Sequence, residues 1–252
     1  MLRQLLGSIT ASCALGVAGS LCAGCGASGG APEASATRQT TAPVTRAQAT
    51  AYAHAVNLRP ADVPELASLS SEREVPAPNR SASEFVRCFG GVSPTRAVVN
   101  TLSPEFSSPG GPASQAQFEE SSVRVWPTPG LAARNYAAYQ SSRGRACFLH
   151  GLEASRRQIN TQHPEGLQHG PPAVATVPIT LPGVRQSFLR TKVVPLLRRG
   201  RLRIHIYHDV FTFIYGPAEI ELEATGFSHP VPSATEQRLL SLLLSRAKAS
   251  KL

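Results

Sequence analysis

The sequence predicts an α+β domain in which an antiparallel sheet of about five to six strands packs against helices as a two-layer sandwich. Two observations predict this class: β-type segments follow one another along the chain, and helix-start patterns flank them. The 252 residues are 42% hydrophobic, which is enough apolar material for a core. The 20 glycines and 21 prolines favour short elements joined by turns over long helices.

Three helices are predicted to begin at capping boxes, in which a Ser or Thr and a Glu or Gln three residues later satisfy free amides of the first turn. The boxes begin at Thr45, Ser81 and Ser233. The first helix extends to about Asn57, the second carries Cys88 on a face expected to be buried, and the third is rich in leucine. Apolar spacing predicts two more helices, at 131–140 and 145–159.

Strands are predicted from β-branched runs and from alternation of apolar and polar residues. They cover residues 97–102, 118–126, 174–181, 186–196, 202–207 and 218–224, with a tight turn at 198–200. Alternation is clearest in the last strand, where Glu219, Glu221 and Glu223 alternate with apolar residues. This pattern predicts a sheet with one buried face and one face in water.

The first residues have the form of an export signal. Arg3 is the only charged residue in 1–24, and an apolar stretch follows it. That stretch ends at Leu21-Cys22-Ala23-Gly24-Cys25, which resembles the bacterial lipobox, although Cys22 stands where an aliphatic residue is usual. The resemblance implies that Cys25 is lipidated and that the chain is cleaved before it.

The expected organisation is therefore a lipoprotein signal peptide at 1–24, a flexible tether at 25–43 and a single envelope domain at 44–252. Residues 26–43 contain no aromatic and no large aliphatic residue, so they cannot bury enough surface to fold. Two alternatives stay open: the apolar stretch could remain as a membrane anchor, since about 20 apolar residues span a bilayer, or it could direct ordinary secretion. All three alternatives export the domain and anchor or release it outside the membrane.

The five cysteines fit this organisation. Cys13 and Cys22 fall in the signal and Cys25 is the lipid site, which leaves Cys88 and Cys147. Two thiols in an oxidising compartment predict one disulfide, and two buried free thiols are the alternative.

A basic stripe is the clearest surface feature of a chain with net charge +9. Its cations are Arg185, Arg190, Lys192, Arg198, Arg199, Arg201 and Arg203. All but the first form a candidate docking face for anionic lipid headgroups or cell-wall phosphates. The alternative is a solvated edge hairpin whose charges prevent strand pairing. Export makes nucleic acid an unsuitable partner for this charge.

Catalytic and metal patterns are weak. His205 and His208 are three residues apart, so on a strand they point to opposite faces. His163, Glu165 and His169 lie in a loop with no sign of the partners that orient metal ligands. We expect no cofactor, no metal and no catalytic residues.

Four features together resemble secreted lipoproteins of high-GC Gram-positive bacteria. They are the segment from Tyr52 to Leu58, the pair Cys88 and Cys147, the strand from Ser121 to Val125, and the segment from Gly216 to Leu222 before a leucine-rich final helix. Some of these proteins have PsbP-like α+β folds, and others are similar to extracellular sensor domains of receptor kinases.

The resemblance implies a non-catalytic sensor or binding module of the cell envelope, held to the outer face of the membrane by its lipid. Its expected partners are the membrane and an anionic lipid, a cell-wall polymer or an envelope protein. A carrier for a lipid or small hydrophobic ligand is the alternative, and an exported hydrolase is the third. A polar cleft would favour the sensor and an apolar cavity the carrier.

Overall fold

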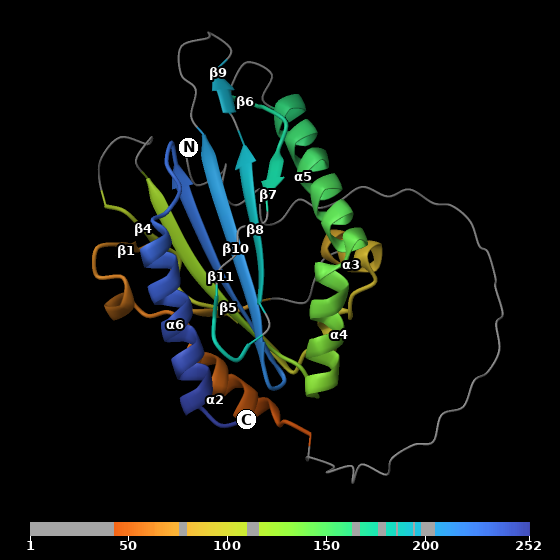
Figure 1. The fold of residues 1–252 in the computed structure, drawn as a ribbon, viewed down its shortest axis with the longest axis vertical. Coiled ribbons are helices and arrows are strands. Elements are labelled where there is room, and N and C mark those ends of the chain that lie inside the picture. Colours follow the sequence, from red (N-terminus) through yellow and green to blue (C-terminus); the bar gives the residue numbers. More distant parts are fainter. Residues whose placement is uncertain are drawn as a thin grey trace, which may run out of the picture.

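A computed structural model describes residues 43–75, 80–109, 116–162, 167–175, 180–184, 186–193, 195–197 and 205–252 (Figure 1). The signal peptide, Cys25, nearly all of the tether and the turn at 198–200 lie outside these residues, so the expectations about them stay predictions. Among the described residues, no helix combines the length and the apolar character needed to cross a bilayer.

The described residues form five helices, two short 3-10 helices and eleven strands. The helices are α2 (Arg46–Val56), α3 (Arg80–Phe89), α4 (Pro129–Gln140), α5 (Ser142–Gln162) and α6 (Ser233–Ala249), and the 3-10 helices are η1 (Pro60–Asp62) and η2 (Pro94–Arg96). The strands are β1 (Ala67–Ser68), β2 (Arg73–Glu74), β3 (Val99–Leu102), β4 (Phe106–Ser107), β5 (Gln117–Val125), β6 (Leu167–His169), β7 (Ala173–Ala175), β8 (Gln186–Val193), β9 (Pro195–Leu197), β10 (Ile206–Tyr215) and β11 (Ala218–Phe227).

Nine of these strands form one antiparallel sheet, which confirms the predicted α+β class. The order is β1-β4-β5-β11-β10-β8-β7, with β3 also paired to β5 and β2 paired to β3. Strands β3, β5, β8, β10 and β11 have four or more residues, in line with the predicted number, and the others are short edge pieces. The last strand in the chain, β11, lies inside the sheet between β5 and β10.

Helices cover both faces of the sheet, so a second helical layer adds to the predicted sandwich (Figure 1). On the first face, Ile220 and Leu222 of β11 join one apolar core with Leu239 and Leu243 of α6 and with residues of α2. The second face carries the alternate residues of the same strands, and α4 packs on it through contacts with β10 and β11. A short turn joins α4 to α5, and a disulfide joins α5 to α3.

The structure corrects the prediction for the strand at 202–207. The observed strand is β10, Ile206–Tyr215, which pairs with both β8 and β11 along its length. His208 and Asp209 interrupt its apolar pattern, although Asp209 is fully buried. The described pairing of β8 with β10 ends at Val193 opposite Ile206, and the predicted turn at 198–200 lies outside the described residues. Strand β9 leaves the sheet and pairs with β6.

The first of the three predicted capping boxes forms as expected, and the other two helices begin earlier than predicted. At α2, the Thr45 side chain accepts from the Gln48 amide and the Gln48 side chain accepts from the Thr45 amide. Helix α3 begins at Arg80, so Ser81 is already inside it. At α6 the N-cap is Pro232, which offers no side-chain bond.

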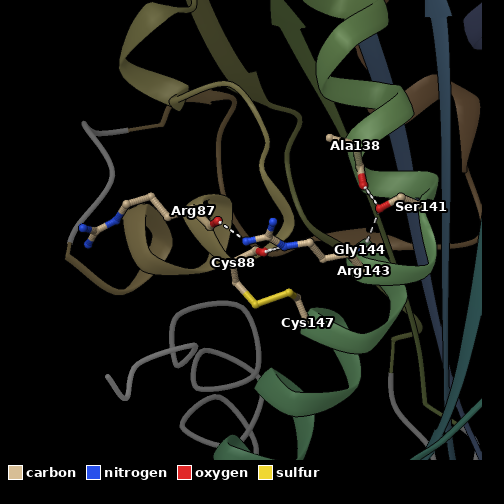
Figure 2. The surroundings of a disulfide bond; sticks show 7 residues. All are labelled: Arg87, Cys88, Ala138, Ser141, Arg143, Gly144 and Cys147. Carbon is tan, nitrogen blue, oxygen red and sulfur yellow. Dashed lines mark hydrogen bonds between the residues drawn. A yellow bond between two sulfur atoms is a disulfide. The ribbon is translucent and has the colours of Figure 1, made fainter. Parts of the chain in front are cut away.

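A disulfide between Cys88 and Cys147 joins α3 to α5, as the cysteine count predicts (Figure 2). Cys147 is buried, but Cys88 is exposed, contrary to the expectation from helix spacing. The bond spans 59 residues of sequence. By the chain-entropy argument a loop of this size stabilises the fold by about 4 kcal/mol.

The side chains of Arg143 and Ser141 form hydrogen bonds near the disulfide that fix α3, α4 and α5 (Figure 2). The Arg143 guanidinium donates to the carbonyls of Arg87 and Cys88 at the end of α3, and the Arg87 carbonyl also accepts from the Gly90 amide. Ser141, the single residue between α4 and α5, donates to Ala138 and accepts from the Gly144 amide. A Cβ on Gly144 would lie 2.1 Å from the Tyr139 carbonyl oxygen, so this turn requires glycine.

Candidate functional site

Most of the predicted docking cations lie outside the residues that the structure describes. Arg185, Arg198, Arg199, Arg201 and Arg203 lie outside the described residues. Arg190 and Lys192 lie on β8, at the register positions opposite Asp209 and Tyr207 of β10. The docking hairpin therefore stays a prediction.

The histidines do not form a common site. His208 lies on β10 opposite Thr225, and His205 precedes that strand. His169 is buried on β6, where its backbone amide and carbonyl bond to the Asn160 side chain. His163 and Glu165 lie outside the described residues. Within the described ranges, no three His, Cys, Asp or Glu side chains are grouped so that they could hold a metal ion.

Polar side chains instead gather on the second face of the sheet, which we call the carboxylate face. Its members come from β5, β10 and β11 and share one side of the register. They are Glu120, Arg124, His208, Thr212, Glu219, Glu221, Glu223 and Thr225. The sequence predicts that its glutamates lie in water, but Glu219 is only 9% exposed and the other two are half-buried. The prediction is wrong because α4 lies over this face.

Glu219 is the one carboxylate of this face whose oxygens are all used. Its Oε1 accepts from Arg124 Nη1 at 3.0 Å. Its Oε2 accepts from Asn135 Nδ2 of α4 at 2.7 Å and from the Trp126 indole at 3.2 Å. Asn135 in turn accepts from the amide of Val92 at 3.1 Å. Glu219 therefore ties β11 to β5, to α4 and, through Asn135, to the segment after α3.

Glu221 and Glu223 lack such compensation. Glu221 accepts from the Thr212 hydroxyl at 3.1 Å and hydrogen-bonds to Glu223, and neither carboxyl has an Arg or Lys partner among the described residues. Burial and the charge of Glu223 raise the pKa of Glu221 to about 8. Burial and the charge of Glu120 raise the pKa of Glu223 to about 7. At neutral pH the pair therefore shares protons.

Neighbouring groups extend this environment. Glu120 pairs with Arg73 at 3.2 Å, yet burial raises its pKa to about 7. Tyr139 of α4 contacts the Phe89 ring, with 6.0 Å between centroids. Burial, and then the charges of Glu221, Glu223 and Glu219, raise the pKa of its hydroxyl well above the ordinary value. Tyr139 thus stays a neutral hydroxyl over this face.

One arrangement on this face has the order of a hydrolase triad. His208 Nδ1 lies 2.8 Å from the Thr225 hydroxyl, and its Nε2 lies 3.7 Å from a Glu223 oxygen. Burial lowers the pKa of His208, so its ring is neutral near pH 7. However, Thr225 is buried in the middle of a strand paired on both sides, where the ladder uses the backbone amides that an oxyanion hole needs. The arrangement supports structure better than acyl transfer.

No protein-family model matches this chain, and no curated protein is significantly similar to it in sequence. A solved structure that does match is the extracellular domain of PknH from Mycobacterium tuberculosis. The match covers 82% of this chain and 98% of that domain, with 12% sequence identity and a TM-score of 0.34. A similarity of this size does not extend to function.

Replacing Glu219 tests its role in the fold. We expect Glu219→Ala to lower the free energy of unfolding by about 3 kcal/mol, because it leaves a half-buried guanidinium, a buried indole and a buried amide without their acceptor. Urea unfolding measures the change. Glu221→Ala is the control and should lower the free energy of unfolding less, because the Glu221 carboxyl has no Arg or Lys partner in the described part of the chain. Equal losses would contradict the distinction.

The raised pKa values predict that stability falls as the pH rises. Between the ordinary carboxyl value of 4.5 and about 8, the folded protein holds protons that the unfolded chain has released. This contribution is complete below pH 4.5 and is lost as the pH passes 7 to 8. The histidines with lowered pKa values change the stability only below pH 6.5. A comparison of unfolding at pH 7 and at pH 9 therefore measures the contribution of the carboxyls.

The expected effect of Glu221→Gln/Glu223→Gln is that the loss of stability from pH 7 to 9 shrinks by more than half. The remaining loss comes from Glu119 and Glu120, whose pKa values are both about 7. Glu74→Gln removes an exposed carboxyl that does not contribute to these raised pKa values and should leave the loss unchanged. An unchanged loss in the double variant would show that the pair does not hold these protons.

Proposed function

We propose that this chain is an exported, membrane-tethered module that binds a polar ligand on the carboxylate face and carries out no chemistry. Export and the lipid at Cys25 rest on the signal and lipobox resemblance. The disulfide between Cys88 and Cys147 supports an oxidising compartment outside the cytoplasm.

The observation that carries the binding proposal is the uncompensated pair of Glu221 and Glu223. Each unit by which burial raises a carboxyl pKa corresponds to about 1.4 kcal/mol of lost interaction with the charged form. Glu219, two residues away on the same face, shows that the fold can satisfy a buried carboxylate completely. Half-buried carboxyl groups with raised pKa values and no counter-charge are typical of binding sites.

The chemistry of this face selects a ligand with hydrogen-bond donors and positive charge. An ammonium or guanidinium group would supply the counter-charge that Glu221 and Glu223 lack, and the Thr212 hydroxyl and Tyr139 offer polar neighbours. A lipid tail would leave these groups unpaired, at a cost for each one. The polar face therefore favours the binding module over the carrier.

The lipid anchor is tested at Cys25. We expect Cys25→Ser to move the protein from the membrane fraction to the medium or the soluble fraction, because the thiol that receives the lipid is gone. Fractionation with metabolic labelling by a palmitate analogue measures both effects, and Cys22→Ser is the matched control that keeps the lipid site. Membrane retention of the Cys25→Ser protein without label would support an uncleaved anchor instead.

The binding face is tested with spermidine as a probe of ammonium recognition. Calorimetry on residues 43–252 should show binding that is lost in Glu221→Gln/Glu223→Gln and kept in Glu65→Gln. Binding should also release protons and strengthen from pH 6 to 8, because the cation favours the ionised carboxyls. Binding of palmitate in place of spermidine would support the carrier, and equal binding by the double variant would overturn the assignment of the face.

A further inference from the structure

The arginines of this protein differ in their partners on the two sides of the sheet. Around α2 and α6, three arginines form ion pairs with carboxylates, whereas the Arg59 side chain donates to the backbone carbonyls of His54 and Ala55. The pairs are Arg46 with Glu74, Arg238 with Glu65 and Arg246 with Asp62. Each of these cations is therefore at least partly neutralised.

The layer of α3, α4 and α5 has the opposite character. Helices α4 and α5 carry five arginines and one acid, Glu153, which pairs with Arg156. The exposed arginines of the layer form no ion pair with a described carboxylate. They are Arg87, Arg134, Arg143, Arg145 and Arg157. Arg143 and Arg145 do bond to backbone carbonyls, which satisfies donors without neutralising charge.

An exposed leucine lies among these cations on α5. Leu149 is 39% exposed, and it is one of two large apolar side chains exposed in the described part of the chain. Arg145 lies four residues before it, which places both on one side of the helix. His150 and Arg157 are also exposed, whereas the opposite side of α5 is buried through small residues and Ile159.

We infer that the outer side of α5, formed by Arg145, Leu149, His150 and Arg157, docks on an anionic phospholipid membrane. The inference rests on the proposed tethering. The composition of residues 25–43 predicts a coil that would hold the domain roughly 20 to 25 Å from its anchor, within reach of the bilayer surface. Cations near such a surface contribute electrostatic attraction, and an apolar side chain between them inserts at the headgroup boundary. An anionic polymer would use the cations alone, so Leu149 favours the membrane.

The domain alone can test this docking, because every residue of the main core and its packed neighbours lies between Val44 and Ala247. The probe is residues 43–252 with Leu149→Trp, mixed with vesicles of phosphatidylglycerol and phosphatidylcholine or of phosphatidylcholine alone. The chain's own Trp126 is fully buried, so a change in emission reports on position 149. We expect a blue shift and protection from a soluble quencher with the anionic vesicles only.

Sedimentation of the otherwise unaltered domain with the same vesicles gives the affinity. Arg145→Ser/Arg157→Ser should weaken binding about fivefold per arginine, so roughly 25-fold in all. Leu149→Ser keeps the charge and should also weaken it. The matched control, Arg46→Ser/Arg238→Ser, removes equal charge from the other helical layer and should change binding much less.

Three results would overturn the inference: equal loss in the two double variants, equal emission with both vesicles, or binding to soluble polyphosphate that Leu149→Ser leaves unchanged. The last result would assign the surface to a polymer. Because this domain lacks Cys25, a failure to bind vesicles would not contradict the lipid anchor, which the Cys25→Ser variant tests separately. Conversely, an unlipidated Cys25 would leave the vesicle measurement valid.

Discussion

The Glu219 carboxylate holds the second helical layer on the sheet. It accepts hydrogen bonds from β5 and from Asn135 of α4, and Asn135 fixes the Val92 amide after α3. Helix α5 follows α4 after the single residue Ser141, and the disulfide returns from α5 to α3. The three helices therefore form a closed set that touches the sheet through the buried Glu219 and through an apolar cluster that joins Leu131 and Ala132 of α4 to Ile214 of β10. The groups beneath α4 depend on both contacts.

Glu219 and Glu221 show how one strand can combine a structural carboxylate with one to which we assign a binding role by proposal. Alternation places them on the same side of β11, two residues apart. The first is surrounded by donors from three parts of the chain, while the second has a hydroxyl and another carboxyl. The two carboxylates therefore differ because different side chains pack over them. The exposed cations of α5 belong to the same helical layer but point away from the sheet. The layer of α3, α4 and α5 therefore has the carboxylate face on its inner side and a basic surface on its outer side.

Local patterns predicted much of the fold, because their physics is local. Thr45 and Gln48 are three residues apart and form the expected cap, and alternation in β11 identified its apolar side correctly. The prediction failed where distant partners decide the outcome. The Glu219 side is covered because Asn135, 84 residues away, binds it, and no spacing shows this. Strand β10 was missed because two strands flank it and allow the buried Asp209 in its interior. From the sequence, only the three alternating glutamates of the carboxylate face could be identified, because most of its other members lie on different strands.

The position of β11 also constrains how the protein can be made. It is the last strand to be synthesised, yet it alone connects β5 of the early part of the chain to β10 of the late part. Until Phe227 has emerged, the chain can offer only two separate half-sheets, each with an unpaired edge that invites aggregation. Helix α6, which closes the core over that junction, emerges later still. The sheet therefore needs protection until both β11 and α6 have emerged.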